Sequence, residues 1–139
     1  MSQPTMYTDA LAEEICEAIS NTSKGLKELC DENPHWPGPQ GIRKWVVSKE
    51  KFGAMYARAK QAQADFMVEE ILSISDDGSN DYYTDEKGVV RLDGEHVQRS
   101  RLRVDSRKWL AAKLAPRAYG EKKEVSVEES LMTKIIDKL

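Results

Sequence analysis

The sequence lacks the motifs and long apolar runs that many enzymes and membrane proteins require. No G-x-x-x-x-G-K-[ST] segment occurs, so ATP hydrolysis by a phosphate-binding loop has no visible basis. No apolar run reaches the roughly 18 residues of a membrane span, and MSQPTMYTDA lacks the basic and apolar regions of a signal peptide. We therefore expect a protein that neither spans a membrane nor is secreted.

Cysteine and histidine are also scarce, with two of each in 139 residues. Cys16 and Cys30 lie in separate helical patterns without a C-x-x-C pair, which disfavours a disulfide framework and a metal site. His35 and His96 each lack a neighbour that would complete a ligand set or a nucleophile pair. We expect two core thiols, no metal, no cofactor and no enzymatic activity.

Charge is plentiful, and its two signs alternate in blocks along the chain. The net charge is only -3, but residues 41–63 contain six basic and one acidic residue, and residues 98–123 contain nine basic and two acidic residues. Residues 64–97, between them, contain ten acidic and two basic residues. Such asymmetry points to an anionic partner at the basic blocks or to pairing between blocks of opposite sign.

The first 53 residues contain three short helical patterns. The first begins at Thr8 or Asp9, the second after a cap at Ser23, and the third after Gly38-Pro39, because proline suits the first position of a helix. The third pattern runs to about Val47. Its inward positions are Ile42, Trp45 and Val46, and its outward positions are Gln40, Arg43 and Lys44.

Three short helices with polar and basic residues on the outside of the last one indicate a helix-turn-helix module, because such side chains reach phosphates and base edges in a major groove. A small helical bundle with a solvated third helix is the alternative. The connection DENPHWPGP is longer than the usual turn of about 3 to 4 residues. The docking angle of the third helix therefore stays open.

A much longer helical pattern follows, from Lys49 or Glu50 to about Ser75, and would measure roughly 39 Å. A helix that is apolar on several faces needs several partners, and a chain of this size supplies too few, so self-association is expected. The apolar positions on the long helix include Phe52, Met55, Ala59, Ala62, Phe66, Met67, Val68, Ile71, Leu72 and Ile74.

The acidic residues 76–94 are expected to form a loop with a hairpin of Tyr82 to Thr84 against Val89 to Leu92.

The last long helix is expected from Glu95 to Ala115, antiparallel to the one before it. Leu102 and Trp109 share one face and Val104, Ala111 and Ala115 another, so a single partner would cover only one of the two. Arg99, Arg103 and Arg107 form a basic ridge that could face Asp65 and Glu69 or contact DNA. Pro116 ends the helix.

The stretch RSRLRVDSRKWLAAKLAPRAYGEK closely resembles the end of the central region in small terminase subunits of tailed double-stranded DNA bacteriophages. There, an RLRVD-x-RKW segment is followed by PR-x-YG-[DE]-K. Upstream, YARAKQAQADFMVEEIL, from Tyr56 to Leu72, is similar to the segment that enters the central helices of this family. The resemblance covers most of residues 8 to 123. The matching residues of the first segment are Arg101, Leu102, Arg103, Val104, Asp105, Arg107, Lys108, Trp109, Pro116, Arg117, Tyr119, Gly120, Glu121 and Lys122.

The resemblance implies a mainly α fold with three parts. These are a helix-turn-helix DNA-binding domain at residues 1–53, a long antiparallel helical pair for oligomerisation at 54–121, and a C-terminal strand and tail at 122–139. The alternation around Val125 and Val127 predicts a strand, and the resemblance implies that this strand joins an intersubunit barrel.

The resemblance also implies a function and partners. Such a protein binds concatemeric viral DNA at the packaging site, forms a homo-oligomeric ring of eight or nine subunits, and delivers DNA to a large terminase subunit that holds the ATPase and nuclease. It would act in the host bacterial cytoplasm and be absent from the mature virion. Residue by residue, the DNA contacts would be Gln40, Arg43, Lys44, Lys49 and Lys51, and the ring contacts Phe66, Ile71, Leu72, Leu102, Trp109 and Leu110.

Two other functions remain as alternatives. A helix-turn-helix transcriptional regulator would bind a palindromic site as a dimer rather than as a ring. A metal-dependent nuclease would use the carboxylates of Asp65, Glu69 and Glu70 to hold Mg²⁺, although salt bridges on a helix surface are the more ordinary role for such residues.

Overall fold

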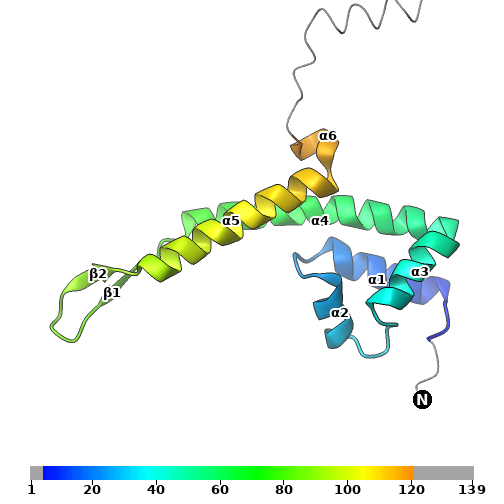
Figure 1. Cartoon of the computed structure of the whole chain (residues 1–139), viewed down its shortest axis with the longest axis horizontal. Coiled ribbons are helices and arrows are strands. Elements are labelled where there is room, and N and C mark those ends of the chain that lie inside the picture. The colour runs from blue at the N-terminus through cyan, green and yellow to red at the C-terminus, as the bar shows by residue number, and fades with distance from the viewer. Residues whose placement is uncertain (1–4, 121–139) are drawn as a thin grey trace, which may run out of the picture.

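The computed structural model describes residues 5–120, which form six helices and one two-stranded hairpin. One long helix, α4, organises the rest: α1 and α3 pack along one half of it, α5 lies along it, and the hairpin extends beyond its far end (Figure 1). No helix in this part of the chain is both long enough and apolar enough to cross a membrane. The elements are α1 (Asp9–Ser20), α2 (Leu26–Glu32), α3 (Pro39–Ser48), α4 (Glu50–Asp76), β1 (Tyr82–Thr84), β2 (Val90–Leu92), α5 (Gly94–Leu114) and α6 (Pro116–Tyr119).

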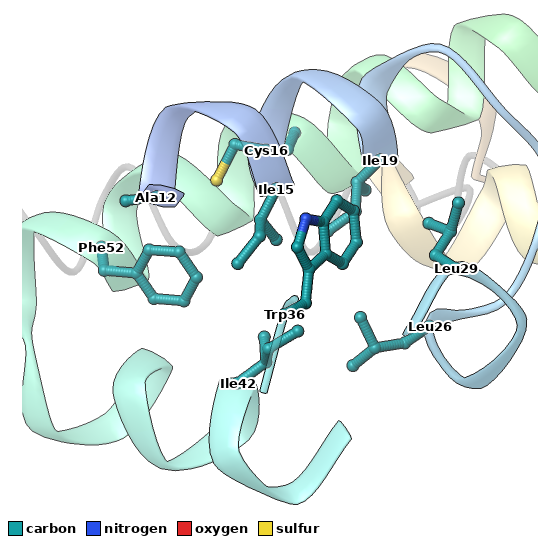
Figure 2. Close-up of a cluster of buried hydrophobic side chains, with 10 residues drawn as sticks. Ala12, Ile15, Cys16, Ile19, Leu26, Leu29, Trp36, Ile42 and Phe52 are labelled. Atoms are coloured by element: carbon teal, nitrogen blue, oxygen red, sulfur yellow. The ribbon is translucent and has the colours of Figure 1, made fainter. Parts of the chain in front are cut away.

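The first three helices and the start of α4 share one apolar core. Trp36, from the connection between α2 and α3, is 5% exposed and lies in the middle of this core, among Ile15 and Ile19 of α1 and Leu26 of α2 (Figure 2). The long connection is therefore part of the packing, because it inserts an indole where a short turn would place none. The buried members are Ala12, Ile15, Cys16, Ile19, Leu26, Leu29, Trp36, Ile42, Phe52 and Ala59.

The polar edge of Trp36 is held by α1. Its indole Nε1 donates a hydrogen bond to Glu14 Oε2 at 2.6 Å, and His35 Nε2 lies 2.7 Å from the same oxygen. These contacts, with that from Trp36 as the larger cause, hold the pKa of Glu14 below its ordinary value. Burial of an indole without a partner for its N–H would be costly, so Glu14 fixes the connection to α1.

The observed helix starts agree with the sequence at α1 and differ at α2. Thr8 caps α1, since its side chain accepts a hydrogen bond from the backbone N–H of Leu11 at 3.1 Å. The predicted cap of α2 at Ser23 is wrong, because α2 begins two residues later with Gly25 as its cap. The Ser23 hydroxyl instead lies 3.4 Å from Arg107 Nη2 of α5.

A buried glutamine joins the N-terminal helices to α4. Gln63 is the one buried polar side chain among the described residues, and its Nε2 donates to the backbone carbonyls of Thr22 at 2.9 Å and Lys24 at 3.2 Å. Both carbonyls belong to the loop between α1 and α2. A buried amide needs such partners, so this pair of bonds holds the loop against the middle of α4.

The two long helices form the antiparallel pair expected from the sequence (Figure 1). Ala111, on the inner face of α5, is buried, and Val104 and Ala115 are half-buried. The expectation that a single partner covers only one apolar face of α5 is thus correct.

The predicted hairpin is confirmed as an antiparallel pair in which Tyr82 lies opposite Leu92 and Thr84 opposite Val90.

The mainly helical fold is confirmed, whereas the domain boundary at residue 53 and the C-terminal strand with its barrel stay predictions. The core around Phe52 also includes Ala59 and the half-buried Met55 and Tyr56, which follow the predicted boundary at residue 53. The strand expected around Val125 and Val127, and its intersubunit barrel, lie outside the described residues.

Candidate nucleic-acid interface and assembly surface

The outer face of α3 gathers three of the five residues expected to contact DNA. Gln40, Arg43 and Lys44 are all exposed, and together with Val47 and Ser48 they line one open surface. Neither Arg43 nor Lys44 forms a salt bridge within residues 5–120. Two unpaired cations beside an amide on one helical face are suited to phosphates and base edges.

The inner face of α3 is anchored by aromatic packing. The ring centroids of Tyr7 and Trp45 are 5.1 Å apart, and those of Trp45 and Phe52 are 6.0 Å apart, both in edge-to-face geometry. Ile42 is fully buried, and Val46 is partly buried against the same core. The inward set expected from helical spacing is therefore confirmed, and it holds the opposite face toward solvent.

The closeness of α3 to α4 depends on Gly53. A Cβ built on Gly53 would lie 2.7 Å from the backbone carbonyl oxygen of Val46, which is closer than real Cβ atoms approach. Only glycine therefore allows the first turn of α4 to lie against the end of α3. This contact fixes the direction in which the outer face of α3 points.

The two remaining candidates for DNA contact, Lys49 and Lys51, do not line the same surface. Lys49 joins α3 to α4, is half-buried, and places its Nζ 4.4 Å from the centroid of the Tyr7 ring. Lys51 is exposed in the first turn of α4. The structure thus separates the five candidates for DNA contact into the outer face of α3 and a neighbouring pair of lysines.

Three further residues belong to this region and were not singled out from the sequence. Val47 and Ser48 complete the outer face of α3, and the spacing of Val47, seven positions after Gln40, could have revealed it. Lys60 is half-buried on α4, where burial lowers its pKa and the charge of Arg43 lowers it further. Its Nζ lies 5.7 Å from the Tyr56 ring. No periodicity distinguishes Lys60 in the sequence.

A second surface, on α5 and the end of α4, is apolar. Leu102 is 64% exposed and Trp109 is 62% exposed, and Leu72 of α4 and Leu110 are also exposed. Phe66 and Ile71, the other two residues expected to hold the ring, are half-buried. Leu102 and Trp109 are seven positions apart and share one face of α5, and exposed large apolar side chains on one helical face are typical of a surface that another protein covers.

The basic ridge of α5 is divided between two kinds of partner. Arg107 Nε donates to Glu70 Oε2 at 2.6 Å, whereas Arg99 lies 3.4 Å from Glu95 on its own helix. The expectation that Asp65 or Glu69 would face the ridge is wrong for the observed pairs, because the half-buried Glu70 points toward α5. Burial raises the pKa of Glu70, but the hydrogen bonds from Arg107 and Ser23 outweigh this and hold the pKa below its ordinary value.

The carboxylates of the nuclease alternative have separate surroundings. Asp65 accepts a hydrogen bond from the Tyr119 hydroxyl at 2.6 Å, and Glu70 is bound by Arg107. Glu69 is exposed. Within the described part of the chain, no three histidine, cysteine, aspartate or glutamate side chains are placed to hold a metal ion.

Residues 7–126 match a protein-family model described as bacteriophage Sf6, terminase small subunit-like. The chain belongs to this family. Three crystal structures of the terminase small subunit gp1 of bacterial virus Sf6, each with a different single mutation, are 32% identical to it with a TM-score of 0.68. Each match covers 89% of this chain and 85% of that chain. A comparison with curated proteins found no match.

The match identifies a phage terminase small subunit and agrees with the resemblance seen in the sequence. It extends over all six helices and the hairpin, so the outer face of α3 and the apolar face of α5 both lie within the family region.

Proposed function

We propose that this terminase small subunit is a non-enzymatic DNA-recognition protein. It binds double-stranded viral DNA through the outer face of α3, assembles into a ring through the apolar face of α5, and delivers DNA to a large terminase subunit with ATPase and nuclease activities. The observation that carries the DNA role is the pair of exposed cations, Arg43 and Lys44, that have no carboxylate partner in residues 5–120. The family match favours this role over that of a transcriptional regulator.

Ring assembly is supported by the exposure of Leu102 and Trp109. The inner face of α5 is already covered by α4, so the outer face has no further partner among the described residues. A second copy of the chain is the natural occupant, because a helix that is apolar on two faces needs two partners. The ring of eight or nine subunits is the size that the family resemblance implies.

The DNA role is tested by an Arg43→Ala/Lys44→Ala double variant. Both side chains are exposed, so the fold and the oligomer mass should not change. If each cation neutralises one phosphate, the slope of log K against log salt should become shallower by about 1.8 per bound module. The measurement is fluorescence anisotropy of a labelled duplex at several salt concentrations.

The matched control removes the same charge from the far end of the molecule. Lys87→Ala/Arg91→Ala changes two exposed cations of the hairpin region, of which Arg91 is paired with Asp85, and should leave the slope as in wild type. Equal loss of affinity in both double variants would mean that net charge matters and the outer face of α3 does not.

The last residues of the chain, 124–139, are proposed to bind the large terminase subunit. It rests on the alternation around Val125 and Val127 and on the amphipathic pattern from Leu131 to Leu139. Deleting residues 124–139 should leave DNA binding intact but loosen the ring or abolish capture of the large subunit. Wild-type behaviour in both assays would exclude the proposal.

A further inference from the structure

Val47 is the most exposed of the large apolar side chains in the described part of the chain, at 89%. It lies on the outer face of α3, among Gln40, Arg43, Lys44 and Ser48. The other apolar residues of this part of α3 behave differently, because Ile42, Trp45 and Val46 all pack inward. The valine is therefore the one apolar group on an otherwise polar face.

Helical geometry places Val47 in line with Gln40 and between the two cations. At about 100° per residue, Val47 is offset from Gln40 by only about 20°, with Lys44 on one side and Arg43 on the other. Gln40 and Val47 lie about 10.5 Å apart along the helix axis. Val47 thus lies on the central line of the face, where a bound partner would approach most closely.

The charges beside Val47 indicate the chemistry of that partner. A protein surface that covers a valine between Arg43 and Lys44 would have to supply a carboxylate for each cation, because neither has one in residues 5–120. A DNA major groove presents phosphates to the cations at its edges and bases to the central line. The only apolar substituent on those base edges is the C5-methyl of thymine, which apolar side chains such as alanine and threonine contact.

The dimensions agree with this arrangement. An α-helix with its side chains is about 10 to 12 Å across and a major groove is about 12 Å wide, so α3 can lie along the groove with both ends of its outer face near base edges. Gln40 at one end has the amide that pairs with adenine. Val47 at the other end has the methyl groups that pack against thymine.

We propose that Val47 reads thymine methyl groups in the major groove and gives this subunit a preference for A·T-containing segments. This inference rests on the proposed function, since it requires that α3 enters the groove. It assigns to Val47 a specificity role and leaves the electrostatic affinity to Arg43 and Lys44. The predicted effect is modest, because one buried methyl group corresponds to about a four-fold change in affinity.

The test compares two duplexes that differ only in the methyl group. An A·T-rich sequence is prepared with thymine and, separately, with uracil throughout, and the affinity of the full-length assembled protein is measured for both. Wild type should bind the thymine duplex about four-fold more tightly per module. Val47→Ala should lose most of this preference, because its single methyl group extends less far toward the bases, and its helix should be intact because alanine is the better helix former.

A matched valine controls for the altered stiffness of uracil DNA. Val90→Ala in β2 removes the same atoms from another exposed valine, and this variant should keep the wild-type preference for thymine. If Val47→Ala keeps that preference as well, Val47 does not read the methyl group. A change in the oligomer mass of Val47→Ala would show that α3 contacts protein there and would overturn the proposal.

The outcome also separates this inference from the function beneath it. If the Arg43→Ala/Lys44→Ala variant loses affinity while wild type shows no preference for thymine, α3 binds DNA but Val47 reads nothing. If neither variant differs from wild type, α3 is not the DNA-binding helix and both proposals are wrong.

Discussion

Arg107 and Glu70 connect the two long helices through a hydrogen bond of 2.6 Å between Nε and Oε2, and both side chains are partly buried. The same guanidinium reaches Ser23 in the loop between α1 and α2, at 3.4 Å from Nη2 to Oγ. This one arginine therefore joins three parts of the molecule: α5, which carries the apolar surface, α4, and the helices that present the outer face of α3.

Replacing Arg107 with alanine should destabilise the protein by about 1 to 3 kcal/mol, because Glu70 would be left partly buried without its cation. Urea unfolding followed by circular dichroism measures the loss. Arg99→Ala is the control, since its exposed pair with Glu95 is worth at most about 1 kcal/mol. Equal effects of the two variants would show that the position of Arg107 between the helices has no special value.

The contribution of Glu70 should depend on pH. Its pKa is lower in the folded protein than in the unfolded chain, so the native state favours the ionised form. That stability is present above the unfolded pKa, about 4.3, and is lost as the pH falls through the folded pKa. Glu70→Gln cannot ionise, so the difference in stability between it and wild type should shrink on acidification. A difference that stays constant from neutral to acidic pH would contradict this account.

Much of this architecture follows from local sequence patterns. The Gly38-Pro39 start of α3, the inward positions Ile42 and Trp45, and the hairpin all follow from turn chemistry or periodicity, and all are observed. Such features depend on neighbours close in the chain, which the sequence displays directly. The exposed and covered faces of α5 follow from the same spacing.

The features that sequence patterns missed depend on contacts between distant residues. Trp36 lies in a loop without periodicity, yet its indole fills the core and bonds to Glu14, 22 positions away. Arg107 pairs with Glu70 rather than with Asp65 or Glu69 because of how α4 is rotated against α5. That rotation is set by packing along both helices, and no single spacing displays it.

Gly53→Ala offers a test of how α3 is positioned. Alanine normally favours a helix over glycine by about 0.5 to 1 kcal/mol, but here its Cβ would collide with the carbonyl of Val46. We expect a net loss of stability of about 1 to 3 kcal/mol and weaker DNA binding, because α3 must move away from α4. Gly94→Ala, which has open space around its Cβ, is the control. A Gly53→Ala protein as stable as wild type would refute the importance of this contact.

We propose above all that the exposed Trp109 on α5 assembles this terminase small subunit into a ring. Native mass spectrometry of the full chain tests this assembly most directly, with Trp109→Ala as the disrupting variant and Val47→Ala as a control on the outer face of α3. We predict an octamer or nonamer for wild type and for Val47→Ala. Trp109→Ala should give much smaller species, because truncating a hot-spot aromatic costs about 2 kcal/mol or more of binding free energy. This loss would recur at every subunit interface of the ring. A wild-type monomer or dimer, or an intact ring for Trp109→Ala at the same concentration, would contradict the account.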